Sequence, residues 1–136
     1  MQLGIGMYLV AVGDVEDSLT RFGSRYLERV FTPTEIAAAR SGRYVGCLAA
    51  CFAAKEATLK VLAAPDGGIG WTDIEVGLAA RGAASLTLHG AAAQAARRAG
   101  IDSVEVSVTQ SDGYAAAIAL TVGCAKGRPA IEEQAC

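Results

Sequence analysis

The sequence predicts an α+β domain in which helices pack on one face of a mostly antiparallel sheet. Apolar residues recur at helical spacing through most of the first half of the chain, whereas polar and apolar residues alternate in short runs through the second half. Two pairs of these runs are separated by turn residues, as in β-hairpins. A chain of 136 residues with 52% hydrophobic content is the size of one domain with a single core.

The first half is expected to contain one strand followed by three helices. Residues 3–12 alternate imperfectly and are β-like. In FTPTE, either Thr32 or Thr34 can cap a helix that carries Glu35 in its first turn. The run APDGGIG at residues 64–70 ends the longest helix, because its glycines and proline interrupt helical structure. The expected helices run from 14–18 to Val30, from Thr32 or Thr34 to a turn at 41–42, and from Tyr44 to about Leu62.

The second half is expected to contain four strands and one helix. The helix, residues 90–98, is rich in alanine and is followed by Gly100, which suits a left-handed cap. The expected strands are residues 71–76, 85–89, 104–108 and 114–122. Residues 123–136 show no apolar period, so residues 1–122 are predicted to form one domain with a loose C-terminal tail.

Charge and hydropathy argue against two classes of partner. The net charge is -2 and the pI is about 5.3, so the chain has no basic field to attract nucleic acid or anionic lipid. No apolar run approaches the roughly 20 residues of a membrane span. The N-terminal MQLGIGMYLVAVG lacks a basic leading region and is expected to be a strand rather than a signal peptide. We therefore expect a cytoplasmic protein that binds neither nucleic acid nor membrane.

The cysteines and the single histidine give weak functional signals. Cys47 and Cys51 lie four apart on the apolar side of the long helix, where a thiol behaves as a small hydrophobe. Together with Cys124 and Cys136 they lack the spacing of a zinc site, although a metal or redox role stays open. His89 ends an alternating segment and is expected to be solvated.

Three charged residues in FAAKEATLK need an explanation. Glu56 and Lys60 can form an ion pair across one helical turn. Lys55 instead falls on the apolar stripe, where an ammonium requires an anionic partner, a lowered pKa or a side chain that reaches water. A Lys-Glu pair beside a glycine-rich break could hold a phosphorylated ligand through the cations and a divalent metal through the carboxylate. The residues by themselves leave a structural and a functional lysine equally open.

A series of segments resembles one family over residues 3–122. The segments are GIG near the start, RFGSRYLERVFTPTE, FAAKEATLKVL, GGIGWTDIEV, LTLHGAAAQAARRAG and VSVTQSDGYAAAIAL, in that order. They are similar to the holo-(acyl carrier protein) synthases, the short trimeric 4'-phosphopantetheinyl transferases. The resemblance implies the fold of those transferases, use of coenzyme A and Mg²⁺, and transfer of phosphopantetheine to a serine of an acyl or peptidyl carrier protein with release of 3',5'-ADP.

The same resemblance implies roles for individual residues. Glu56 matches the metal-binding glutamate of the K-E-A motif, and Lys55 and Lys60 match its neighbouring lysines. Lys55, Lys60 and Gly70 are therefore expected at the coenzyme A site, with Glu56 as the metal ligand. The resemblance also implies a homotrimer with a cleft between protomers, which would explain why Lys55 lies on an apolar face.

Three positions and the last hairpin depart from the family pattern. Tyr8 stands where the family supplies a second metal ligand, an aspartate, and a neutral phenol is a poor substitute for a carboxylate. Ala11 replaces an acidic residue, and Cys51 replaces an arginine. The last hairpin has Thr109-Gln110-Ser111 in place of S-H-D or S-H-E, with Asp112 one position later. We expect these changes to impair the usual Mg²⁺-dependent transfer, unless Asp112 or the phosphates of coenzyme A supply the missing oxygens.

Three functions follow from these matches and departures. The first is a transferase of the usual kind, retuned toward one carrier protein. The second is a metal-independent enzyme of specialised metabolism, in which Lys55, Glu56, Tyr8 and Asp112 converge and act as acids and bases on a small or carrier-tethered molecule. The third is a non-catalytic module that binds a carrier protein.

Overall fold

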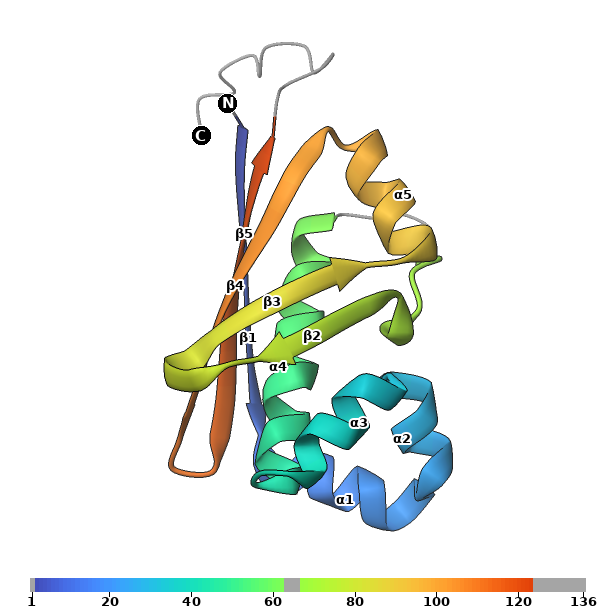
Figure 1. The fold of residues 1–136 in the computed structure, drawn as a ribbon, viewed down its shortest axis with the longest axis vertical. Coiled ribbons are helices and arrows are strands. Elements are labelled where there is room, and N and C mark those ends of the chain that lie inside the picture. Colours follow the sequence, from blue (N-terminus) through green and yellow to red (C-terminus); the bar gives the residue numbers. More distant parts are fainter. Residues whose placement is uncertain (1, 63–66, 124–136) are drawn as a thin grey trace, which may run out of the picture.

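A computed structural model describes residues 2–62 and 67–123, which form five helices and one five-stranded antiparallel sheet of order β1-β5-β4-β3-β2 (Figure 1). This confirms the predicted α+β class, with the helices on one face of the sheet. The elements are β1 (Gln2–Ala11), α1 (Val12–Phe22), α2 (Ser24–Val30), α3 (Pro33–Arg40), α4 (Tyr44–Leu62), the 3₁₀ turn η1 (Trp71–Asp73), β2 (Ile74–Leu78), the 3₁₀ turn η2 (Ala80–Gly82), β3 (Ala83–Leu88), α5 (Gly90–Arg98), β4 (Ile101–Ser111) and β5 (Tyr114–Gly123).

The long helix α4 is the centre of the domain and packs mainly on β5 and β1 (Figure 1). Small side chains make this close packing possible. The helix buries five alanines completely, and the facing side of β5 buries three more. On β1, a Cβ atom at Gly6 would overlap with the carbonyl oxygen of Ala57, so glycine is required for the observed approach. The positions that carry these small residues therefore set how near the side chains of β1 come to those of α4.

Strand β1 presents two different faces. Its even-numbered residues point toward α4, and Val10 is part of the core. Its odd-numbered residues point away and stay exposed, together with Ile118 of the adjacent β5. We call this surface the apolar sheet face; it comprises Leu3, Ile5, Met7, Leu9 and Ile118. A row of exposed large hydrophobic side chains is typical of a surface that another molecule covers.

Several predicted boundaries differ from the structure. The first predicted helix is two helices, because Gly23 has φ of 55° and breaks the run between α1 and α2. Trp71 begins a 3₁₀ turn rather than a strand, and the adjacent strand starts at Ile74. Strand β4 starts at Ile101, three residues before the predicted start. Both strand starts lie where polar residues interrupt the alternation of polar and apolar residues, so the local pattern does not show where sheet pairing begins.

The capping box at the start of α3 is confirmed. Thr32 is the N-cap, with Pro33 in the first turn, and its hydroxyl accepts a hydrogen bond from the Glu35 backbone at 3.2 Å. The long helix also begins and ends where predicted, at Tyr44 and Leu62. Strand β5 runs to Gly123, and the rest of the predicted tail lies outside the described residues. Across the described part of the chain, no helix has both the length and the hydropathy needed to span a membrane.

Candidate functional site

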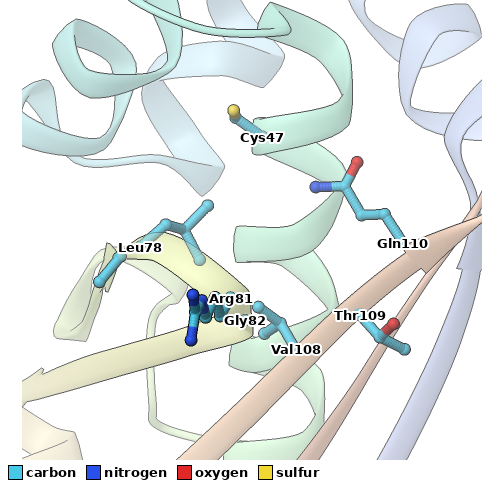
Figure 2. Close-up of a pocket in the computed structure, with 8 residues that line it drawn as sticks. Cys47, Leu78, Arg81, Gly82, Val108, Thr109 and Gln110 are labelled. Carbon is cyan, nitrogen blue, oxygen red and sulfur yellow. The ribbon is translucent and has the colours of Figure 1, made fainter.

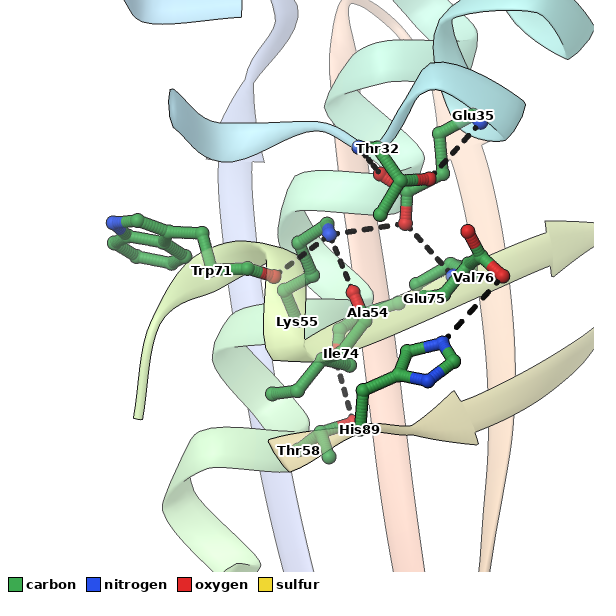
Figure 3. Close-up of polar contacts among 10 residues, drawn as sticks. All are labelled: Thr32, Glu35, Ala54, Lys55, Thr58, Trp71, Ile74, Glu75, Val76 and His89. Atoms are coloured by element: carbon green, nitrogen blue, oxygen red, sulfur yellow. Dashed lines mark hydrogen bonds and ion pairs between the residues drawn. The ribbon is translucent and has the colours of Figure 1, made fainter. Parts of the chain in front are cut away.

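Lys55 lies in a sealed polar cluster between α3, α4 and β2 (Figure 3). Its side chain is fully buried, and its ammonium lies 2.9 Å from a carboxylate oxygen of Glu35, which is also buried. The ammonium donates a hydrogen bond to the carbonyl oxygen of Trp71 at 2.9 Å and another to that of Ile74. All three donors of the ammonium therefore have partners within the protein.

The carboxylate of Glu35 is satisfied in the same way. It accepts hydrogen bonds from the backbone N–H groups of Thr32 at 3.0 Å and Val76 at 2.8 Å, in addition to the ion pair with Lys55. Burial raises the pKa of Glu35, while Lys55 and these two N–H groups act in the opposite direction. The cluster joins α3, α4, η1 and β2, so it stabilises their mutual arrangement.

The prediction that Lys55 faces an open cleft is wrong. Its ammonium is buried within the chain and has no donor left for a phosphate or a substrate. The convergence of Lys55 with Glu56, on which the acid-base hypothesis depended, also fails, because the two side chains leave α4 in different directions. The signal that the sequence analysis missed is Glu35, which has a second role besides its place in the capping box.

Glu56, the next residue along α4, belongs to a more open cluster beside β1. It is half-buried, and its negative charge helps to raise the pKa of Tyr8. The Tyr8 ring packs edge-on against Phe52 at a centroid distance of 5.9 Å, and Phe52 stacks on Trp71 at 5.3 Å. These aromatic rings form one wall beside Glu56 and fix the position of the Tyr8 phenol.

Lys60 completes this cluster in a way that the sequence does not suggest. The predicted Glu56-Lys60 ion pair is replaced by a different contact, since the Lys60 ammonium donates to the carbonyl oxygen of Met7 at 2.8 Å. The ammonium also lies 5.5 Å from the centre of the Tyr8 ring, within the range of a cation-π interaction. Lys60 stays exposed, so its charge is available to a ligand.

The titrating groups of the open cluster are shifted by their surroundings. Burial is the main cause of the raised pKa of Tyr8, followed by the charges of Glu56 and Asp14, so the phenol stays neutral and can donate a hydrogen bond. Burial also raises the pKa of Glu56, and the nearby Lys60 opposes that shift. A carboxylate with a raised pKa is a better proton acceptor than an ordinary surface carboxylate. The arrangement therefore combines a proton acceptor, a neutral donor and a cation.

Two other predicted site residues lie apart from this cluster. Asp112 occupies the tip of the β4-β5 hairpin, in a two-residue turn with φ of 50° that Gly113 completes. Strand pairing places Tyr8 opposite Ala117, so the hairpin tip is more than about 10 Å from Tyr8 along the strands. Gly70 precedes η1, where its N–H donates to the Asp73 carboxylate at 2.9 Å and is therefore already used.

A pocket opens near the start of α4 (Figure 2). Its volume is about 340 Å³, and its polar groups include the Cys47 thiol, the Arg81 guanidinium and the Gln110 amide. Residues 47 and 56 are nine positions apart, which places them about 180° apart around a helix. The pocket and the open cluster therefore lie on opposite sides of α4. Sequence reasoning had noted Gln110 as a substitution but had missed Arg81, which only the β2-β3 turn brings here.

The open cluster does not fit the Mg²⁺ ion that the family resemblance implies. Mg²⁺ prefers carboxylate and water oxygens at near-octahedral positions. The open cluster offers it the Glu56 carboxylate, and the Asp14 carboxylate acts on Tyr8 more weakly, but the other groups are a neutral phenol, Tyr8, and an ammonium, Lys60. Within residues 2–62 and 67–123, no three His, Cys, Asp or Glu side chains are placed to hold a metal ion.

Comparison with known proteins identifies the relatives of the chain. Residues 4–119 match the family described as "4'-phosphopantetheinyl transferase superfamily". The chain is 40% identical over 119 residues to the holo-[acyl-carrier-protein] synthase of Koribacter versatilis, covering 86% of this chain and 95% of that protein. It is 40% identical over 124 residues to the same enzyme of Desulforudis audaxviator, covering 90% and 95%.

Solved structures show the same similarity. The ACPS-CoA complex of Chronobacterium ammoniagenes has a TM-score of 0.76 and 28% identity, covering 91% of this chain and 99% of that one. The Helicobacter pylori holo-[acyl-carrier-protein] synthase in complex with coenzyme A has a TM-score of 0.75 and 27% identity, covering 88% and 100%.

Proposed function

The chain belongs to the 4'-phosphopantetheinyl transferase superfamily and, within it, to the holo-(acyl carrier protein) synthases; from this premise, we propose that it transfers 4'-phosphopantetheine from coenzyme A to a serine of a carrier protein. The observation that carries the proposal is the open cluster, where a proton acceptor, Glu56, lies beside an exposed cation, Lys60. Transfer to a hydroxyl requires an acceptor for the hydroxyl proton and a positive charge near the phosphates, and this pair supplies both.

Each group of the cluster has a role in the proposed reaction. The serine oxygen forms a bond to the phosphorus that carries the pantetheine arm, and the bond from that phosphorus to the bridging oxygen of the pyrophosphate breaks. The leaving 3',5'-ADP takes the electron pair of the broken bond, and the serine proton moves to Glu56. Lys60 neutralises the charge on the phosphates, and the Tyr8 hydroxyl donates a hydrogen bond to them.

We also propose that the chain assembles as the trimer expected from the resemblance. The apolar sheet face supports assembly, because Ile5 and Leu9 are 68% and 63% exposed in the single chain. One chain has its Cys47 pocket and its open cluster on opposite sides of α4. In the proposed trimer, a neighbouring subunit would bring its own Cys47 pocket to the open cluster. Light scattering at micromolar concentration should give the mass of a trimer, and a Met7→Glu variant should dissociate it. A monomeric wild-type protein would contradict this assembly.

The transfer assay uses the purified protein, coenzyme A and apo forms of several acyl and peptidyl carrier proteins. Mass spectrometry should detect the mass of the phosphopantetheine arm on the acceptor serine. A carrier protein with that serine changed to alanine is the matched control. The assay should be run both with Mg²⁺ and with EDTA, so that the metal requirement does not decide the outcome. No mass increase on any carrier under either condition would refute the proposed transfer.

The second function predicted from the sequence, acid-base chemistry on a small or carrier-tethered molecule of specialised metabolism, retains one observation in its favour. Tyr8 is a neutral acid, and its pKa is raised partly by the charge of Glu56, a carboxylate base. A coenzyme A binding measurement distinguishes this function from the first. Binding of coenzyme A with transfer of its phosphopantetheine arm supports the transferase, whereas the absence of coenzyme A binding favours the altered chemistry. Carrier-protein binding without any reaction would instead identify a docking module.

A further inference from the structure

We propose that this site works without a divalent metal ion, and that the Lys60 ammonium, held over the Tyr8 ring, is the cation left to bind the phosphates. This inference rests on the proposed transfer of phosphopantetheine and specifies its chemistry. It has three supports, which are the geometry around Lys60, the donor properties of Tyr8, and the charge balance of the cluster.

The position of the Lys60 ammonium is fixed by contacts with a single strand. The carbonyl oxygen of Met7 accepts its hydrogen bond at 2.8 Å, and the ring of the next residue, Tyr8, lies 5.5 Å from it. A lysine side chain is otherwise flexible, so these two contacts reduce the entropy that it loses on binding a phosphate. A cation held at one place before the reaction is the condition for effective electrostatic catalysis.

The close approach of β1 to α4 determines this geometry. Gly6 allows the strand to contact the backbone of Ala57, because no Cβ atom separates them. The side chain of Lys60 passes the same point, since a Cβ atom on Gly6 would lie 3.1 Å from the Cβ of Lys60. The strand therefore carries both the carbonyl oxygen and the ring that hold the ammonium.

Tyr8 contributes a donor where a metal site needs an anionic ligand. Its ring is held by Phe52 at a centroid distance of 5.9 Å, and a phenol is protonated at neutral pH. A protonated phenol donates a hydrogen bond to a phosphate oxygen, but it gives a hard cation no negative charge. The Tyr8 hydroxyl therefore binds the phosphates directly and disfavours a divalent metal ion between the phosphates and the protein.

The charge balance limits what the site loses without the ion. Mg²⁺ carries two positive charges and an aspartate ligand carries one negative charge, so losing both together costs the site only one net positive charge. The cluster of Tyr8, Glu56 and Lys60 is therefore more consistent with a resident ammonium than with a resident metal ion.

Metal binding provides a test that does not depend on activity. Binding of Mn²⁺, used as a spectroscopic substitute for Mg²⁺, should be measured by electron paramagnetic resonance for the wild-type protein, Tyr8→Asp and Tyr8→Asn, with and without coenzyme A. The Tyr8→Asp variant restores a carboxylate and should bind Mn²⁺ at least about tenfold more tightly than the wild type. Tyr8→Asn is the matched control, because it has nearly the shape of Asp without its charge. Saturable Mn²⁺ binding by the wild type that is as tight as that of Tyr8→Asp, with coenzyme A present, would overturn the proposal.

Activity provides the second test, and it uses the wild-type protein, so the folding of a variant does not affect it. The rate of transfer should change by less than about twofold between EDTA and excess Mg²⁺, because no step depends on the ion. Loss of transfer in EDTA with recovery on adding Mg²⁺ would overturn the proposal. If no carrier protein is modified under any condition, the transfer function fails, whereas the Mn²⁺ measurement still decides whether the site holds a metal ion.

The role of Lys60 is tested by two substitutions. Lys60→Met removes the charge and keeps the length of the side chain, and it should lower the transfer rate by about 100-fold. Lys60→Arg keeps the charge and should retain most of the rate that Lys60→Met loses. An unchanged rate in Lys60→Met would contradict the assignment of the ammonium as the cation of the site.

Discussion

Lys55 and Glu56 are neighbours on one helix, but the structure places them in opposite environments. Lys55 is fully buried and paired with Glu35, and all its donors are used. Glu56 is half-buried beside Tyr8 and keeps capacity for a ligand. Consecutive residues are about 100° apart around a helix, which is enough to move a side chain from the interior to an open surface. Two charges of one motif thus have separate duties, one in stability and one in proposed chemistry.

This comparison shows what satisfied polar groups can tell about function. A buried charge with a complete set of partners is a structural element, because ligand binding would have to break contacts within the protein. A partly buried charge with a shifted pKa and an exposed neighbour is a better candidate for chemistry. Variants of the two clusters should therefore lose different properties.

The largest expected effect is on stability, in a Lys55→Met variant. It leaves the Glu35 carboxyl buried without its cation, so the free energy of unfolding should fall by about 3–5 kcal/mol. Urea denaturation followed by circular dichroism measures the change. A double variant, Lys55→Met with Glu35→Gln, removes the unpaired charge and should recover part of the loss. A Lys55→Met protein as stable as the wild type would show that the pair is not what stabilises this region.

The next effect is on activity, in a Glu56→Gln variant. It removes the proposed proton acceptor while keeping the size of the side chain, so the transfer rate should fall by at least about 100-fold. The free energy of unfolding should change by less than about 0.5 kcal/mol, since Glu56 has no buried ion pair to lose. A large loss of stability with unchanged activity would reverse the assignment of the two clusters.

A smaller effect is expected where the two regions are coupled through packing, at Gly6. A Gly6→Ala variant adds a Cβ atom that overlaps with the carbonyl oxygen of Ala57, so β1 must move away from α4. Stability should fall by about 1–3 kcal/mol. Because the movement also displaces Tyr8 from Lys60, transfer should weaken, whereas Gly13→Ala, where a Cβ atom meets nothing within 4 Å, serves as the control. Equal stability and activity of both variants would contradict the close-approach argument.

The smallest expected effect is on the pH dependence of transfer. Glu56 acts as a base only when ionised, and burial raises its pKa above the ordinary value of 4.5. The rate should therefore fall as the pH decreases through this raised pKa, so the acidic limb of the profile lies above pH 4.5. The same shift disfavours the charged form in the folded state, so Glu56 costs a little stability as the pH rises through its folded pKa. Glu56→Gln should lose this acidic limb, and an acidic limb unchanged in that variant would assign it to another group.

The sequence was informative where local rules dominate. The capping box of α3 and both ends of α4 follow from side chains within a few positions of each boundary. The family also followed from the order of short segments, and the comparisons confirm it over residues 4–119. The break between α1 and α2 was available in principle, because Gly23 is the kind of residue that ends a helix, but the continuous apolar spacing concealed it.

The two polar clusters could not be predicted to the same extent. The sequence identified Lys55 as an ammonium that needs a partner, and it identified Tyr8 as a weak substitute for a metal ligand. It could not assign Glu35 to Lys55, because a residue 20 positions away becomes a neighbour only when α3 packs beside α4 and β2. It also predicted the wrong partner for Lys60, because local spacing favours Glu56, whereas the Met7 carbonyl oxygen is reached only through the sheet.

What the sequence alone determined is the set of elements, the ancestry and the chemical groups available, because each of these depends on residue identity and short-range spacing. Only the tertiary structure decided which charges are sealed and which remain open to a ligand. The physical reason is that the cost of burying a charge depends on all the groups packed around it, and these come from distant parts of the chain.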